Sequence, residues 1–136
     1  MIRKLDHLGI AVASIAEGRR FWEALGLEVA AIEEVPQEGV RVAIIPLGEL
    51  RIELLEPTRP DSPVAKFLGE RGPGLHHLCL ASDDLDAADA ALRAGGVDLL
   101  HAQPRPGAAG ARVQFVHPRS ADGVLVELAQ REEEPR

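Results

Sequence analysis

Two histidines and two glutamates stand at matching places in two similar stretches of the chain. The segments LDHLGIA and LHHLCLA line up when the sequence is laid over itself so that His7 meets His77. Later in each stretch, an apolar run carries one glutamate, Glu53 in the first copy and Glu127 in the second. Imidazole nitrogens and carboxylate oxygens together suit a divalent transition metal. A bound metal with open coordination positions can polarise a carbonyl oxygen, so these residues predict a Lewis-acid centre.

Side-chain alternation along strands decides whether the four groups can meet, because successive residues point to opposite faces. The apolar neighbours that would occupy the other face are Leu8, Ile10, Ile52, Leu54, Leu78, Leu80, Val126 and Leu128. A single histidine or glutamate in a strand is more often a core or edge residue, since a buried unpaired charge is unfavourable. The repetition in phase is what favours one metal site built from both copies.

The elements that must position these groups repeat as well. In each copy a helix follows the first strand, after the N-cap residues Ser14 and Asp84, and ends before Gly26 and Gly96. The predicted strands are 5–11, 27–29, 40–45 and 50–55 in the first copy, and 75–81, 97–99, 111–116 and 124–129 in the second. Each copy therefore reads as a βαβββ module.

The predicted fold class is α+β, with two tandem βαβββ modules forming a curved mixed sheet around a metal-containing cleft. One domain spans 1–136: the first repeat covers about 5–57, a linker with a short helix 58–74, the second repeat about 75–130, and a tail 131–136. Each repeat is too short to be expected to fold alone. The linker helix begins at Pro63 after the cap Ser62. In the first repeat's helix, the predicted core face carries Ile15, Phe21, Trp22 and Leu25.

Composition narrows the function classes. The 136 residues carry a formal net charge of −7, which argues against a nucleic-acid partner, and no apolar run suggests a membrane partner. Cys79 is the single cysteine, so no disulfide can form within the chain. With no apolar leader segment visible, we expect a cytoplasmic protein.

The remaining histidines and the cysteine are interpreted as structural. His76 should point to the face opposite His77, while His101 and His117 fall in loops and do not repeat. Cys79 should share the face of His77, where a buried inert thiol is the expected state.

Several longer sequence motifs resemble those of a known protein family, and the resemblance covers most of the chain. RIELLEP, DSPVAKFL, GLHHLCL and HP followed by GVLVEL resemble the methylmalonyl-CoA epimerases, within the vicinal-oxygen-chelate or glyoxalase-like superfamily. The resemblance implies an isomerase that interconverts (R)- and (S)-methylmalonyl-CoA by metal-assisted removal of the α-proton through an enolate. It also implies a homodimer, an acyl-CoA substrate and a divalent ion, with Co²⁺ favoured over Mn²⁺, Zn²⁺ or Ni²⁺.

The same resemblance assigns site residues. The implied metal ligands are His7, His77 and Glu127, with Glu53 as a fourth that binds directly, weakly or through water. Inversion requires a base on one face of the substrate and an acid on the other. Glu127 and the loop residue Glu38 are the two predicted catalytic groups, and an alternative alignment places Gln37 at the second position.

The phosphates of CoA require positively charged side chains to bind them, and arginine is more frequent than lysine in this chain. Arg105, Arg112 and Arg119 are the possible contacts, and their spacing does not select among them.

Other functions remain open on the same fold. One alternative is a glyoxalase I-like lyase that acts on a glutathione hemithioacetal, and extradiol dioxygenases also use two histidines and a carboxylate. Another is a non-catalytic small-molecule-binding protein, against which the complete set of metal-binding residues argues.

Overall fold

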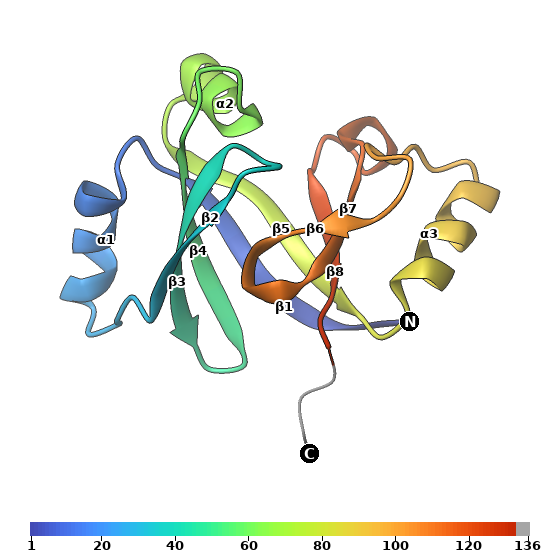
Figure 1. Cartoon of the computed structure of the whole chain (residues 1–136), viewed down its shortest axis with the longest axis horizontal. Helices are drawn as coiled ribbons and strands as arrows, with labels where there is room; N and C mark the ends of the chain where they lie inside the picture. Colours follow the sequence, from blue (N-terminus) through green and yellow to red (C-terminus); the bar gives the residue numbers. More distant parts are fainter. Residues whose placement is uncertain (133–136) are drawn as a thin grey trace. The chain divides into compact units, whose positions relative to one another are not determined.

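The computed structural model describes residues 1–132 (Figure 1). Its elements are β1 (Ile2–Ala11), α1 (Ile15–Ala24), β2 (Ala31–Val35), β3 (Val40–Leu47), β4 (Leu50–Pro57), α2 (Pro63–Arg71), β5 (Gly74–Ser82), α3 (Leu85–Ala94), β6 (Arg105–Pro106), η1 (Ala108–Gly110), β7 (Arg112–Val116), η2 (Pro118–Ser120) and β8 (Val126–Gln130). Strand pairing is both parallel and antiparallel, so the predicted α+β class with two βαβββ modules is confirmed. Among the described residues, no helix is long and apolar enough to cross a membrane.

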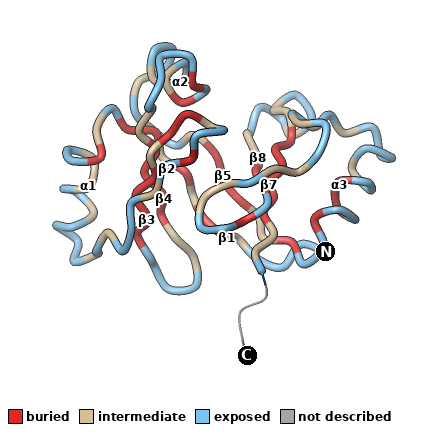
Figure 2. Tube along the Cα trace, viewed as in Figure 1, coloured by how far each residue is buried: buried red, intermediate tan, exposed pale blue. Residues whose placement is uncertain are grey.

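The chain divides into two compact units, residues 7–76 and residues 1–6 together with the chain from His77 onward. In the unit 7–76, β2, β3 and β4 pair antiparallel in that order, and β1 runs parallel to β4. One face of these strands packs on α1 through a core that includes Ile15, Ile45 and Leu54. Buried positions gather along β3 and β4, while α1 is mostly exposed (Figure 2).

In the other unit, β5 pairs parallel with β8, and β8, β7 and β6 follow one another antiparallel. Leu80, Leu92 and Leu128 belong to the core on the side of α3. A second cluster, on the opposite face, contains Cys79 and Phe115. Each unit therefore has one strand face covered by its helix and a second face that carries other groups.

The helix caps form as predicted. The N–H groups of Glu17 and Ala87 donate to the side chains of Ser14 and Asp84, and Ser62 accepts from Ala65 at the start of α2. These bonds satisfy donors at the helix starts that have no partner within the helix.

The strand predicted at 27–29 was wrong, and the one predicted at 97–99 was wrong except for one bridge. The N–H groups of Leu27 and Val97 instead donate back to the carbonyls of Trp22 and Leu92, closing the ends of α1 and α3. Strand pairing begins later, at Ala31 in the first repeat. In the second repeat, Leu99 forms a single bridge before the two-residue β6.

The predicted core face of α1 was partly wrong. Ile15 is buried and Trp22 packs against the core, but Phe21 and Leu25 are 62% and 59% exposed. On a helix of 3.6 residues per turn, Phe21 and Leu25 lie roughly 100° around the axis from Ile15. The sheet covers only the part of the helix surface that carries Ile15 and Trp22. Phe21 packs edge-to-face against Trp22 instead.

Candidate metal centre

His7 and Glu53 form a buried pair within the unit 7–76. They lie on the parallel strands β1 and β4, and Gly9 stands directly opposite Glu53 in the register. The Nδ1 atom of His7 lies 3.3 Å from Oε2 of Glu53. Both residues are buried, with 4% and 3% of their surfaces exposed. The predicted common face of His7 and Glu53 is present, and Gly9 leaves space beside it because it has no side chain.

Arg51 joins this pair. It stands opposite His7 in the register of β1 and β4, and its Nη2 atom lies 3.1 Å from the same Glu53 oxygen, Oε2. Arg51 was not singled out from the sequence. The signal available was its place two residues before Glu53, which puts both side chains on one strand face.

His77 and Glu127 form the corresponding pair in the other unit. They lie on the parallel strands β5 and β8, with Nε2 of His77 3.0 Å from Oε1 of Glu127. The two residues are 6% and 7% exposed. Leu125 occupies the position two residues before Glu127, so this pair has no counterpart of Arg51 at that position.

The donor separations within each pair fit a metal ion. Bonds of about 2.0 to 2.2 Å that meet at 90 to 110° place two donors roughly 2.8 to 3.6 Å apart. The measured separations of 3.0 and 3.3 Å fall in this range. A carboxylate that orients a ligating histidine from the outer shell also lies at such a distance, so the contact suits either role for Glu53.

A polar network that sequence reasoning missed lies behind His77. Gln114 is fully buried, and its Nε2 donates to Oδ2 of Asp89 at 2.9 Å and to the carbonyl of His101 at 2.9 Å. The neighbouring Phe115 packs edge-on against both His77 and His101. Gln114 in an apolar strand and Asp89 on the core side of a helix were the available signals, because buried polar groups need partners.

Asp89 is held as a carboxylate in this network. Burial by itself raises the pKa of Asp89, but hydrogen bonds from Arg93 and Gln114, together with the charge of Arg93, bring it below its ordinary value. The Arg93 bond, from Nε to Oδ1, measures 2.7 Å. Arg93 also donates to the carbonyls of His101 and Ala102, so α3 anchors the loop that holds His101.

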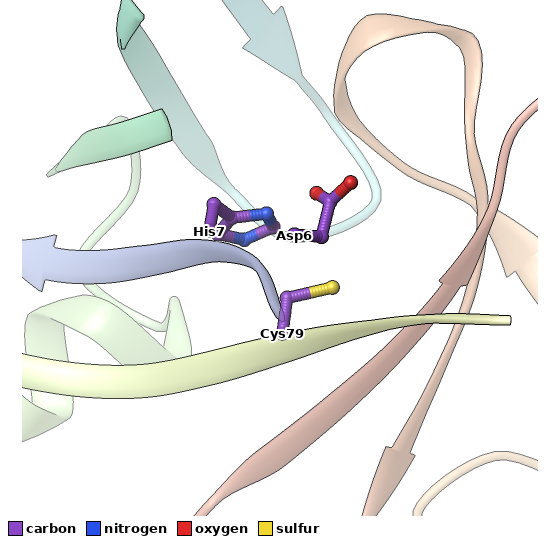
Figure 3. A group of neighbouring side chains, drawn as sticks. All are labelled: Asp6, His7 and Cys79. Carbon is purple, nitrogen blue, oxygen red and sulfur yellow. The ribbon is translucent and has the colours of Figure 1, made fainter. Parts of the chain in front are cut away.

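The other histidines and the cysteine lie where they were predicted. His76 packs edge-on against Phe67, and Nδ1 of His117 accepts from the N–H of Arg119 at the start of η2. Cys79 is a side chain of β5 (Figure 3) and is fully buried. It stands opposite Glu127 in the register of β5 and β8. It lies two residues after His77 on β5 and so shares the face of His77, as predicted.

The register distinguishes the three arginines. Arg105 stands opposite Val113 of β7, and Val113 stands opposite Ala129 of β8. Ala129 shares its strand face with Glu127, because it is two residues further along β8. Arg105 therefore lies on the same face as Glu127. Arg112 instead pairs with Asp86 of α3 at 3.0 Å; this hydrogen bond lowers the pKa of Asp86 and raises that of Arg112. Arg119 pairs with Asp98 at 2.8 Å.

The proposed second acid–base group lies in the turn between β2 and β3. Glu38 is half-buried there, while Gln37 is exposed. Gly39 closes the turn at a φ of 64°, and a side chain at this position would collide with Ser62 and Arg59. The turn is also held by Arg59, whose Nη1 donates to the carbonyl of Pro36 at 2.7 Å.

Glu33 is a further carboxylate that sequence reasoning did not consider. Glu33 stands opposite Val42 of β3, and Val42 stands opposite Leu55 of β4. Residues opposite one another share a face of the strands, and Leu55 shares its face with Glu53 because it is two residues further along β4. Glu33 therefore lies on the same face as Glu53. The neighbouring Glu34 confirms this orientation, because it pairs with Arg41 on the opposite, helix-facing side, where Arg41 also binds Glu56.

The chain is similar to known proteins along most of its length. Residues 6–115 match the model of the glyoxalase/bleomycin resistance protein/dioxygenase superfamily. The ethylmalonyl-CoA/methylmalonyl-CoA epimerase of Cereibacter sphaeroides is 41% identical over 134 residues, which cover 96% of this chain and 99% of that protein. The protein YqjC of Bacillus subtilis is 42% identical over 130 residues, with 95% and 93% covered.

Solved structures give the same result. A substituted Streptomyces coelicolor methylmalonyl-CoA epimerase in complex with 2-nitronate-propionyl-CoA superposes with a TM-score of 0.95 and 38% identity, over 99% of this chain and 100% of that one. The chain therefore belongs to the glyoxalase/bleomycin resistance protein/dioxygenase superfamily and, within it, to the family of the methylmalonyl-CoA epimerases.

Proposed function

We propose that this protein is an isomerase that interconverts (R)- and (S)-methylmalonyl-CoA. The observation that carries the proposal is the pair of buried histidine–glutamate contacts at equivalent positions of the two repeats, His7 with Glu53 and His77 with Glu127. This arrangement occurs in a chain 41% identical to an ethylmalonyl-CoA/methylmalonyl-CoA epimerase.

The four residues His7, Glu53, His77 and Glu127 together would hold one divalent metal ion. The mixture of imidazole and carboxylate donors suits Co²⁺, Mn²⁺, Zn²⁺ or Ni²⁺, of which we favour Co²⁺. When bound, the ion would supply Lewis-acid stabilisation to the thioester oxygen as the α-proton leaves.

We also propose that the protein works as a homodimer in the cytoplasm. The family resemblance supports the dimer, and the single cysteine is in keeping with a reducing compartment.

The acid–base chemistry belongs to carboxylates of the chain. The α-proton of the substrate lies between a thioester and a carboxylate, so its removal leaves an enolate. Glu127 is proposed to remove this proton from one face, and Glu38 to return a proton on the other. Glu33 competes with Glu38 for the second role, because it lies on the strand face of His7 and Glu53 whereas Glu38 lies in a turn.

Arg105 is proposed to bind an anionic group of the acyl-CoA. Of the three arginines considered, it is the one that the strand register places on the Glu127 face. A guanidinium offers several donors that match carboxylate and phosphate oxygens.

Exchange of the substrate α-proton in D₂O tests the proposal directly. Methylmalonyl-CoA would be incubated with metal-free and Co²⁺-loaded protein, and the α-proton signal followed by NMR. We expect metal-dependent loss of the signal, slowed on the order of 10² to 10⁴-fold in Glu127→Gln, as for loss of a general base. Absence of exchange by folded, Co²⁺-loaded protein would refute the epimerase assignment. Glutathione hemithioacetals would then be the next substrates to test, since the glyoxalase I-like alternative predicts turnover of those compounds.

A further inference from the structure

Arg131, the first residue after β8, binds two other segments of its unit at once. Its Nε and Nη2 atoms donate to the two carboxylate oxygens of Asp6 on β1, at 3.2 and 2.9 Å. Its third nitrogen, Nη1, donates to the carbonyls of Ala108 and Ala109 in η1, at 3.5 and 3.1 Å. A guanidinium presents its donors in a rigid planar fork, so these bonds fix η1 relative to Asp6.

The ion pair of Arg131 and Asp6 is largely shielded from water. Asp6 is 7% exposed, and the side chain of Arg131 is 23% exposed. Water therefore screens this pair less than it screens a pair on the surface. One oxygen of Asp6 also lies within 4.8 Å of the sulfur of Cys79, which stands opposite Glu127 in the register (Figure 3). The pair thus adjoins the strand face that carries Glu127.

The turn between β6 and β7, residues 107–110, packs on the same strand face. Val113 of β7 has its side chain on the Glu127 face, as the strand register shows. Gly107 lies directly against that side chain, because a Cβ added at Gly107 would come within 2.7 Å of Cγ1 of Val113. Arg131 therefore holds a turn that covers part of the Glu127 face.

The turn contains a backbone conformation that needs support from outside. Ala109 has a φ of 56° and a ψ of 34°, a left-handed conformation that residues with a Cβ rarely adopt. Within the turn, the N–H of Gly107 donates to the carbonyl of Ala111, and the N–H of Ala111 donates to the carbonyl of Ala108. Arg131 adds a bond to the carbonyl of Ala109 itself, and so supports the residue whose conformation is least favourable.

We propose that Arg131, together with Asp6, is a positioning residue for the acyl-CoA, because it fixes the turn 107–110 over the Glu127 face. The inference rests on the proposed function, in which Arg105 binds an anionic group of the substrate. Arg105 lies on β6 two residues before Gly107, so a displacement of the turn would displace Arg105 as well. Arg131 acts through the turn and does not contact the reacting atoms.

Amide hydrogen exchange tests the hold on the turn without any substrate. Exchange would be followed by mass spectrometry in wild type, Arg131→Gln and Arg131→Lys. We expect residues 107–111 to exchange faster in Arg131→Gln, on the order of tenfold, because the turn can then open without breaking its bonds to Arg131. The amides of α3 should exchange as in wild type, whereas a general loss of stability would accelerate them too.

Arg131→Lys keeps the positive charge but lacks the planar fork, so residues 107–111 should exchange at an intermediate rate. This variant also carries the test if Arg131→Gln folds poorly, because it leaves Asp6 with a cationic neighbour. Arg3→Gln is the control, since it removes an exposed arginine of β1 that pairs with Asp83 in the same unit. It should leave the exchange of the turn and the kinetic constants unchanged.

Steady-state kinetics test the consequence for the substrate. Arg131→Gln should raise the KM for methylmalonyl-CoA on the order of tenfold, with a smaller effect on kcat, because Arg105 is then less well placed. Asp6→Asn should raise KM in the same way. The double variant should lose no more than either single variant, since both substitutions break one contact.

Unchanged exchange of residues 107–111 in both Arg131 variants would overturn the inference, as would additive KM effects in the double variant. A raised KM in Arg131→Gln with unchanged exchange of the turn would overturn it as well, because Arg131 would then contact the substrate directly. These results in an active wild type refute this inference alone. If wild type supplied with Co²⁺ does not exchange the α-proton of methylmalonyl-CoA, the proposed function fails, and the role of Arg131 toward the acyl-CoA fails with it.

Discussion

His77 and Glu127 stand on the neighbouring parallel strands β5 and β8, and Nε2 of His77 lies 3.0 Å from Oε1 of Glu127. Residues far apart in the sequence are brought into contact by the pairing of these strands. His7 and Glu53 are brought together in the same way by the pairing of β1 with β4. The repeat therefore produces a histidine–glutamate pair twice, once in each unit, through Nδ1 of His7 and through Nε2 of His77.

The first prediction concerns the histidines of the two pairs. Substitution of either His7 or His77 by alanine should lower Co²⁺ affinity by more than about 100-fold, because loss of outer-shell partners alone already lowers metal affinity 10- to 100-fold. Isothermal titration of the metal-free proteins would measure the change. His76→Ala is the matched control: it lies beside His77 but packs on Phe67, and it should bind Co²⁺ like wild type. Equal losses in His76→Ala and His77→Ala would contradict the proposed ligand set.

The second prediction identifies the second acid–base residue. In an epimerase with two bases, loss of one base should slow epimerisation on the order of 10²-fold or more, while the remaining base still exchanges the α-proton of one stereoisomer. Exchange in D₂O would be followed for each stereoisomer separately in Glu38→Gln and Glu33→Gln. We expect this one-sided exchange in Glu38→Gln.

The same experiment decides between the candidate residues. If Glu33→Gln gives one-sided exchange and Glu38→Gln behaves like wild type, the second base lies on β2 and our choice of Glu38 is wrong. Gln37→Ala serves as the control for the turn, because Gln37 is exposed beside Glu38. A loss of activity in Gln37→Ala equal to that in Glu38→Gln would contradict a specific role for Glu38, and would point to the shape of the turn or to the alignment that places Gln37 at the second position.

The third prediction concerns recognition of the acyl-CoA. Arg105→Gln should raise KM by roughly 10- to 100-fold with a smaller effect on kcat, because loss of a charge-assisted hydrogen bond weakens binding by about 1.5 to 3 kcal/mol. Steady-state kinetics would separate the two constants. Arg112→Gln is the comparison, since Arg112 is paired with Asp86 on the helix side, and its KM should stay at the wild-type value. A raised KM in Arg112→Gln together with an unchanged KM in Arg105→Gln would contradict the prediction, because the anion would then bind on the helix side of the strands.

The fourth prediction concerns the network behind His77. Because the pKa of Asp89 is lowered in the folded protein, its ionised form stabilises the fold at every pH above the ordinary aspartate pKa. This contribution is lost as the pH falls through the lowered pKa. Asp89→Asn should therefore destabilise the protein at neutral pH by about 2 kcal/mol, the size of a hydrogen bond to a charged group.

Urea unfolding of wild type and Asp89→Asn as a function of pH would test this sign. The difference between the two proteins should be constant near neutrality and should shrink in acid, below the ordinary aspartate pKa. Asp86→Asn provides a surface control, because Asp86 is exposed and its pair with Arg112 is screened by water. A difference for Asp89→Asn that stays constant down to the lowest pH would contradict the role assigned to the ionised carboxylate.

Local patterns in the sequence were sufficient to predict most of the helices and strands and to select the four candidate ligands. Alternation along a strand follows from backbone geometry, so the order of residues alone assigns His7, Glu53, His77 and Glu127 to strand faces. The helix starts at Ser14, Ser62 and Asp84 were predictable for a similar reason, since a cap is a bond between residues close in the chain.

The sequence misled where an apolar alternation arose from packing and not from strand pairing. Leu27 and Val29 alternate because their side chains pack on the core, while the N–H of Leu27 closes the end of α1. Phe21 and Leu25 were predicted to be core residues because they extend the apolar stripe of α1. The width of the stripe in the sequence does not tell how much of it the sheet will cover.

The amino-acid sequence by itself determined the repeat, the caps and the faces of the strands, because each depends on interactions between neighbours in the chain. Only the tertiary structure decided which faces acquire which partners. The contact of His7 with Glu53, the face of Arg105 and the burial of Asp89 against Gln114 all depend on how strands and helices are arranged relative to one another. That arrangement is set by hydrogen bonds and packing between residues distant in the sequence, which no local pattern encodes.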